Sequence, residues 1–171
     1  YTISLTATNA QGSDVETKNN YIVVAQVTGP CTASAVCDEY INTVSFNTIN
    51  NTSACGNNGY TDFTGTSTSV AQGTAYTLTI TPAIVNNTQA SAYTNDEIAA
   101  WIDFNNDFDF NDAGEQVAYV LVAAGWTNTF NVTIPLASYT GTVRMRVRIS
   151  YQPDGAINPC GPASYGETED Y

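Results

Sequence analysis

The alternating stretch at residues 141–151 constrains the fold of this chain most. Val143, Met145, Val147 and Ile149 are apolar at every second position, with arginines between them. Side chains point alternately to the two faces of a strand, so this pattern predicts a β-strand with one apolar face. Shorter alternations recur between turns spaced roughly 8–12 residues apart, and no useful helical period occurs. We therefore expect an all-β fold, an antiparallel β-sandwich of jelly-roll or immunoglobulin-like kind with long loops.

The same reading places the other elements. Strands are expected at residues 1–7, 15–17, 39–49 (a pair or one bent strand), 75–81, 98–102, 117–123 and 130–134. Pro82 and Pro135 should end the strands before them, because proline donates no ladder hydrogen bond. Residues 31–38 and 152–171 are predicted to be loops. Trp101 is expected in the core.

The arginines at 144, 146 and 148 would share the other face of the 141–151 strand. Only one further basic residue, Lys18, occurs in the chain. Arg144, Arg146 and Arg148 could grip carboxylate or sulfate groups of an acidic polymer, because guanidinium groups match planar anions. They could equally pair with Asp and Glu on neighbouring strands. We favour internal pairing, because 4 basic residues face 16 acidic ones.

An acidic stretch, WIDFNNDFDFNDAGE at residues 101–115, follows the apolar strand at 98–102. Oxygen-bearing side chains recur at every second position, and Ca²⁺ takes about six to eight oxygen ligands. The pattern D-x-[DN]-x-[DN]-G with a later Glu is typical of calcium loops. Phe108 stands in place of the Gly, and the Glu comes one position late. We predict a calcium loop on a β scaffold, with an ordinary polar turn as the alternative. The predicted ligands are Asp103, Asn105, Asp107, Asp109 and Glu115.

A second acidic cluster lies at residues 165–171. Glu167, Glu169 and Asp170 could complete the same cation site, form a second one, or face the three arginines. Glu167 and Glu169 lie two positions apart, so they should point the same way in an extended chain.

Charge and composition exclude several classes of function. The net charge of −12 argues against nucleic acid and anionic membrane surfaces as partners. No run of about 20 apolar residues is present to span a membrane. The chain contains no His, which removes the commonest general base and zinc ligand. No nucleophile elbow or glycine-rich phosphate loop occurs. We therefore expect no enzyme.

Four cysteines suggest two disulfides and an extracellular setting. Of the three possible connectivities, we favour Cys31–Cys37 as a local loop and Cys55–Cys160 as a long-range link. The chain begins within a strand and carries no signal peptide, so we expect it to be part of a longer protein that is secreted or held at the cell surface.

Two resemblances add to this reading. YTISLTATNAQGSDVETKNNYIVVA at residues 1–25 resembles the closing hairpin of an immunoglobulin-like PKD domain, with a linker at 26–30. DEYI (38–41), NTSACGNNGYTDFT (51–64), AWIDFNNDFDFNDAGE (100–115), VRMRVRI (143–149) and YGETEDY (165–171) together resemble the GEVED domain over residues 31–171. That resemblance implies a β-rich accessory module of large secreted proteins from Bacteroidetes-like bacteria, which often also carry proteases or polysaccharide-degrading enzymes.

These observations lead to one expected function and two alternatives. We expect a calcium-stabilised, non-catalytic module that binds a polysaccharide and targets an appended enzyme. Aromatic rings stack on sugars, and the candidates for that role are Tyr93, Tyr119, Trp126, Tyr139 and Tyr151. The first alternative is a structural spacer or adhesion unit without a glycan ligand. The second is a glycoside hydrolase using two carboxylates, which is disfavoured because the carboxylates cluster where a cation would sit.

Overall fold

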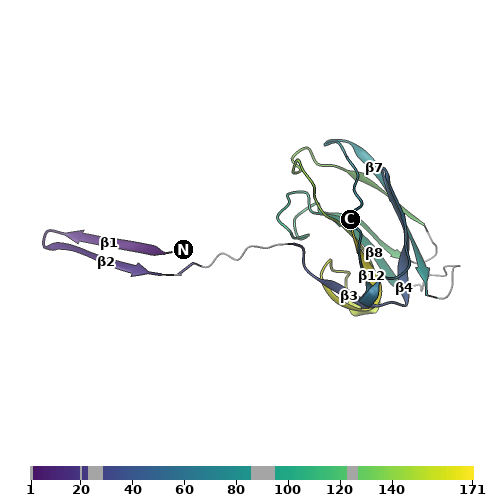
Figure 1. Ribbon diagram of the computed structural model, residues 1–171, viewed down its shortest axis with the longest axis horizontal. Coiled ribbons are helices and arrows are strands. Elements are labelled where there is room, and N and C mark those ends of the chain that lie inside the picture. The colour runs from purple at the N-terminus through teal and green to yellow at the C-terminus, as the bar shows by residue number, and fades with distance from the viewer. Residues whose placement is uncertain (1, 20, 23–28, 86–94, 123–126) are drawn as a thin grey trace.

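Two β-sheets pack face to face in this computed structural model (Figure 1), which describes residues 2–19, 21–22, 29–85, 95–122 and 127–171. The smaller sheet has the order β10 (Asn128–Thr133), β7 (Ala75–Ile84), β4 (Glu39–Phe46), β5 (Ile49–Thr52). The larger sheet has the order β3 (Ala33–Val36), β12 (Gly161–Asp170), β11 (Met145–Tyr151), β8 (Asp96–Ile102), β9 (Gln116–Val122). A short strand, β6 (Tyr60–Asp62), also pairs with β12.

The described residues confirm the all-β prediction. They contain only two short 3-10 turns, η1 (Asn57–Gly59) and η2 (Gln152–Asp154), beside the strands. None of these helical segments is long or apolar enough to cross a membrane. Most strand pairs are antiparallel, but β3 and β6 run parallel to β12, which the sequence did not indicate.

One apolar core lies between the two sheets. Ile41 of β4 and Ile80 of β7 belong to the same buried cluster as Ile98 of β8 and Val147 of β11. The alternation at residues 143–149 therefore works as expected, with Met145, Val147 and Ile149 inward. Trp101 is buried as predicted, on the opposite face of β8.

The N-terminal hairpin forms as predicted. β1 (Ile3–Asn9) pairs antiparallel with β2 (Gly12–Lys18), and the turn lies between Asn9 and Gly12. Every described residue from 2 to 19 is exposed, so the hairpin buries no apolar face of its own. An isolated two-stranded hairpin is marginally stable in water. The assignment of residues 1–25 to a PKD-like domain stays a prediction, and residues 23–28 of this segment and the linker lie outside the described residues.

Pro82 does not end its strand. β7 continues to Ile84, and Pro82 pairs opposite Ile41 where the register between β4 and β7 shifts. A register irregularity tolerates a residue that lacks an N–H, which explains why proline lies within this strand.

The prediction of loop throughout residues 152–171 is wrong. Residues 161–170 form β12, which pairs with β11, β3 and β6. β12 is hidden from pattern analysis because its inward positions are acidic instead of apolar. Residues 31–38, also predicted as loop, contain β3.

The predicted disulfide pairing is wrong, although all four cysteines are bonded. Cys31 bonds to Cys160, and Cys37 bonds to Cys55. The parallel pairing of β3 with β12 brings Cys31 beside Cys160, despite a sequence separation of 129. Two disulfides are typical of proteins from oxidising or extracellular compartments.

We expect peptide mapping of the oxidised chain to recover this connectivity. Proteolysis without reduction, followed by mass spectrometry, should yield peptides joined through Cys31–Cys160 and through Cys37–Cys55. A peptide joining Cys31 to Cys37 would contradict the strand arrangement, because it would leave β3 unlinked to β12.

Candidate functional site

The acidic loop begins where β8 ends. Asp103 is buried, and its two carboxylate oxygens accept hydrogen bonds from the N–H groups of Asp107 (3.2 Å) and Phe108 (3.0 Å). Phe108 has a φ of 72°, the left-handed conformation that glycine adopts most easily. Phe108 therefore makes the tight turn that the calcium-loop pattern assigns to Gly, and the carboxylate of Asp103 holds that turn in place.

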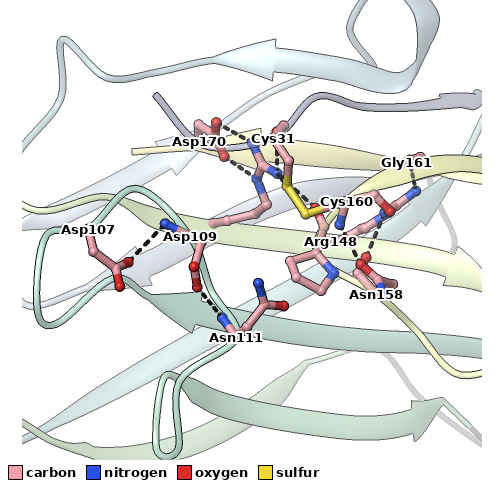
Figure 2. Close-up of a disulfide and its surroundings, with 11 residues drawn as sticks. Cys31, Asp107, Asp109, Asn111, Arg148, Asn158, Cys160, Gly161 and Asp170 are labelled. Atoms are coloured by element: carbon pink, nitrogen blue, oxygen red, sulfur yellow. Dashed lines mark hydrogen bonds and ion pairs between the residues drawn. A yellow bond between two sulfur atoms is a disulfide. The ribbon is translucent and has the colours of Figure 1, made fainter. Parts of the chain in front are cut away.

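A series of side-chain turns continues along the loop. The side-chain oxygen of Asn105 accepts from the N–H of Asp107 (3.1 Å), and that of Asp107 accepts from Asp109 (3.1 Å). Asp109 in turn accepts from the N–H of Asn111 (2.8 Å), as Figure 2 shows. Asx-turns of this kind are ordinary in polar loops and do not require a cation.

Glu115 closes the loop from the other side. Its carboxylate is buried and accepts from the N–H of Phe104 (3.0 Å) and from that of Asp112 (3.3 Å). Burial raises the pKa of Glu115 above its usual value. Both predicted buried ligands, Asp103 and Glu115, therefore hold loop backbone.

In the exposed part of the loop, carboxylate oxygens lie around the side-chain amide of Asn105. The side-chain nitrogen of Asn105 donates to Asp107 Oδ2 (3.0 Å) and to Asp112 Oδ2. A donor occupies the point where two carboxylates meet, and a cation would take the same position. Within the described ranges, no group of three or more acidic, His or Cys side chains converges as a metal site. Calcium binding therefore stays a prediction.

The second acidic cluster lies elsewhere. Glu167 and Glu169 point inward from β12 and are fully buried between the sheets. Glu167 accepts from the N–H groups of Ile41 (3.0 Å) and Gly56 (2.8 Å), and from the hydroxyl of Thr61 (3.1 Å). The oxygens of Glu167 thus accept hydrogen bonds from β4, from the segment before β6 and from β6 itself. Metal coordination by Glu167 and Glu169 stays a prediction.

Glu169 lies beside the hydroxyl of Ser53. This hydroxyl has one proton to donate but two oxygen atoms within hydrogen-bonding distance. The hydroxyl of Ser53 is 2.9 Å from the carbonyl of Ile41 and 2.6 Å from Glu169 Oε1. Burial raises the pKa of Glu169 to about 7. A protonated Glu169 can donate to Ser53 while Ser53 donates to Ile41, so both short contacts are satisfied together. The hydroxyl of Tyr171 donates to the other carboxylate oxygen (2.7 Å).

We expect the Glu169→Gln variant to lose less stability than wild type when the pH is raised. The folded pKa of Glu169 lies above the unfolded value of 4.5, so its contribution is full below pH 4.5 and is lost as the pH rises through about 7. The Gln amide can donate to Ser53 at every pH. Urea unfolding at pH 4.5 and pH 8 should show a smaller decrease for the variant than for wild type. Glu16→Gln, in the exposed hairpin, is the control. Its free energy of unfolding should decrease between the two pH values by as much as that of wild type.

Asp170 points to the opposite face of β12, toward the arginines. Arg146 donates from Nε to Asp170 Oδ1 (2.7 Å) and from Nη2 to Asp170 Oδ2 (2.8 Å), and both residues are buried. Arg144 approaches the same carboxylate at 3.4 Å. The structure thus shows the favoured internal pairing for Arg144 and Arg146. The carboxylate of Asp170 is paired with guanidinium groups, and metal coordination by Asp170 stays a prediction.

The Cys31–Cys160 disulfide lies beside this ion pair (Figure 2). Arg146 donates to the carbonyl of Cys31 (2.9 Å), and Arg148 donates to the carbonyls of Asn158 (2.6 Å) and Gly161 (2.9 Å). Burial, followed by the charge of Arg146, lowers the pKa of Arg148 to about 10. The interpretation of these arginines as a grip on an acidic polymer does not fit Arg146 and Arg148, because both guanidinium groups are enclosed by backbone carbonyls.

An open groove adjoins the acidic loop and was not foreseen from the sequence. Its volume is about 370 Å³. The lining residues are Phe104, Asn105, Asp112, Ala113, Gly114, Glu115, Pro135, Ala137 and Ser138. The groove joins the loop after β8 to the connection after β10, two segments that are remote in sequence. The N–H of Tyr139 donates to the carbonyl of Phe104 (2.6 Å), which holds these segments together.

The aromatic ligand candidates are dispersed. Tyr139 is half exposed and follows the groove-lining Ser138 in the chain. Tyr119, on β9, is also half exposed, and its hydroxyl donates to Glu97 (2.6 Å). Tyr151 packs edge-on against Tyr165. Tyr93 and Trp126 lie outside the described residues. Tyr139 is therefore the described candidate placed next to the groove.

Comparison with known protein families gives a match for part of the chain. No curated protein and no solved structure matches it. The motif Gly166 to Asp170 (GETED), on which the resemblance depended, lies in β12 and joins the two sheets through Glu167. Residues 97–171 match the family model of the GEVED domain.

Proposed function

We propose that residues 31–171 form one GEVED-type module that binds polysaccharide without catalysis, requires calcium, and targets an enzyme carried by the same secreted protein. The proposed boundary extends beyond the matched residues because the core needs both sheets. β10 pairs with β7, and the core cluster includes Ile41 and Leu78, which precede residue 97. The matched segment alone would leave this apolar face exposed.

The groove beside the acidic loop carries the proposal. Its lining includes the carboxylate of Asp112, the amide of Asn105 and the apolar side chains of Phe104 and Pro135. Carbohydrate sites combine both kinds of surface, because sugars present hydroxyls at their edges and C–H groups on their faces. Tyr139, which follows the lining residue Ser138, can add a ring beside the groove.

Calcium fits the donor set of the loop. Asp107 and Asp112 converge on the side chain of Asn105, whose amide would present its oxygen after a half-turn. Ca²⁺ accepts such oxygens together with water and carbonyl groups. Bound there, the cation would supply positive charge at the groove wall, where sugar hydroxyls could replace its water ligands.

We expect retention on an insoluble polysaccharide that depends on both the cation and the ring. A panel of polysaccharides would be tested with calcium and with EDTA, and binding isotherms measured for any that retain the protein. Asp112→Asn should lose retention. Tyr139→Ala should weaken it by about tenfold or more, as loss of a central aromatic contact does. Tyr165→Ala is the matched control, since Tyr165 is also exposed but is not next to any groove-lining residue in the chain, whereas Tyr139 directly follows Ser138.

Chelation is expected to lower the melting temperature by several degrees. The acidic loop contains carboxylates whose repulsion a bound ion would relieve, and a ligand that binds only the folded state stabilises it. Differential scanning calorimetry with and without EDTA measures the shift. An unchanged melt in EDTA would remove calcium from the proposal.

A structural spacer or adhesion unit is the second candidate function. The observation that favours it is the dispersion of Tyr119, Tyr139 and Tyr151, which belong to three separate parts of the chain: β9, the segment after β10, and β11. Absence of retention on every polysaccharide of the panel, with calcium present, would favour this candidate over the first.

A further inference from the structure

Two buried carboxylates, one from each sheet, lie at one end of the sandwich, away from the acidic loop. Glu39 is the first residue of β4 and shares the inward face of Ile41. Asp96 is the first residue of β8 and lies two positions from Ile98, so it shares that residue's face. Ile41 and Ile98 belong to the same core cluster. Both carboxylates therefore point into the space between the sheets.

Three of the four oxygens of these carboxylates lack a hydrogen-bond partner. Asp96 is 0% exposed, and both of its oxygens lack a hydrogen-bond partner. Glu39 is 2% exposed, and its Oε1 also lacks one. A buried polar atom without a partner carries the full cost of losing water, so such atoms in native proteins have an explanation.

No cationic side chain compensates these charges among the residues that the structure describes. Arg144 and Arg146 pair with Asp170, and Lys18 pairs with Glu16 in the hairpin. Arg148 donates its hydrogen bonds to backbone carbonyls. Two unpaired carboxylates between sheets are expensive unless they are neutralised.

The electrostatic surroundings are negative. Burial, then the charge of Asp96, raises the pKa of Glu39 to about 8. Burial, then the charge of Asp38, raises the pKa of Asp96 to about 7. These shifts agree with the geometry, because in the described part of the chain no basic side chain pairs with either group, and each lies near another carboxylate. The pair would be neutralised by protons or by a bound cation.

We propose that Glu39 and Asp96 bind a divalent cation between the two sheets, a Ca²⁺ site separate from the acidic loop. The unpartnered oxygens supply an oxygen-only donor set. Ca²⁺ accepts irregular arrangements of carboxylates, completed by backbone carbonyls and water. The chain has no His, and its four cysteines are in disulfides, which disfavours zinc. Because β4 and β8 belong to different sheets, the ion would tie the sheets together at this end.

The ion count of the whole 171-residue chain tests this site independently of the acidic loop. Calcium alone would be titrated by calorimetry, and native mass spectrometry would count the bound ions. The loop variant Asp107→Asn/Asp112→Asn should retain one ion. Adding Glu39→Gln and Asp96→Asn should remove it. A loop variant that binds no calcium, or a combined variant that still binds, overturns the proposal.

The amide substitutions preserve side-chain size, and near-ultraviolet circular dichroism checks that the combined variant folds. If the combined variant does not fold, the loop variant provides the test. EDTA should lower the melting temperature of the loop variant by several degrees, and an unchanged melting temperature would overturn the proposed site. A pair that shares a proton would give a different result. Asp96→Asn would then raise the melting temperature with no dependence on calcium, which also overturns the proposal. Loss of polysaccharide retention in the loop variant, with this ion still bound, would affect only the proposed function of the groove.

Discussion

Arg146→Met is expected to destabilise the fold by about 3–5 kcal/mol, because it leaves a buried carboxylate without its main partner. Arg146 is 1% exposed and holds Asp170, also 1% exposed, through two parallel hydrogen bonds. Methionine fills similar space but donates nothing. Asp170 would keep the hydroxyl of Tyr60 (3.0 Å) and the distant guanidinium of Arg144 (3.4 Å), which do not replace a bidentate pair.

Further contacts of Arg146 add to this cost. Its Nη1 donates to the carbonyls of Cys31 (2.9 Å) and Pro159 (2.7 Å), and these acceptors flank the Cys31–Cys160 disulfide. The guanidinium carbon lies 5.1 Å from the ring centroid of Phe110, within the acidic loop. Loss of the guanidinium therefore disturbs three segments that are brought together at the outer face of the larger sheet.

Arg144→Met provides the matched control. The Arg144 side chain is 31% exposed and meets Asp170 at 3.4 Å, so we expect a loss of at most about 1 kcal/mol. Urea unfolding with both disulfides intact would measure the two variants. Equal decreases in the free energy of unfolding for the two variants would show that burial does not make the Arg146–Asp170 pair more important than the exposed contact of Arg144. The double variant Arg146→Met/Asp170→Asn should lose less than the sum of the single ones, because the residues interact directly.

The strands with apolar alternation could be predicted from the sequence. The run at residues 143–149 lies in and just before β11, and the apolar segment at 98–102 lies in β8. In β11 one face meets the core, so the two-residue period survives in the sequence. β8 is buried on both faces, so it appears as a continuous apolar run instead. Residues 39–49, predicted as a strand pair or one bent strand, contain β4 and only the first residue of β5, which continues to Thr52. Asn47 adopts the positive φ of the turn between the two strands.

β12 could not be found in this way. Its inward positions, Glu167 and Glu169, are tolerated only because donors from distant segments satisfy them. Those donors include the N–H of Ile41, 126 residues earlier, and the hydroxyl of Ser53, 116 residues earlier. A pattern that depends on remote partners leaves no local signal. The disulfide pairing failed for the same reason, because Cys31 reaches Cys160 only through the unpredicted pairing of β3 with β12.

The candidate site was predicted in part. The loop after β8 turns where the calcium pattern requires, even though Phe108 replaces Gly, because Asp103 holds the turn through two backbone N–H groups. The groove wall formed by Pro135 and Ser138 depends on how the chain returns after β10. That return is set by tertiary packing, so no local motif marks it.

Gly166→Ala should prevent stable folding, with an expected loss above about 4 kcal/mol. Gly166 has a φ of 127°, a conformation that residues with a Cβ avoid. An added Cβ would lie 2.1 Å from the carbonyl oxygen of Ile149 and 3.0 Å from the Cα of Ser150. Both belong to the backbone of β11, the neighbouring strand in the sheet. Neither can move aside as a flexible side chain could, so β12 would separate from β11 at the position before Glu167.

Gly155→Ala separates the conformational cost from the collision. Gly155 also has a positive φ, 110°, but an added Cβ there would meet nothing within 4 Å. This control should lose about 1–3 kcal/mol, the usual cost of holding a side chain in such a conformation. Urea unfolding of both variants, or the soluble yield where Gly166→Ala does not fold, provides the comparison. Similar losses at the two positions would mean that β12 does not pass close against β11 at Gly166, and the two-sided burial of the GETED segment would then be wrong.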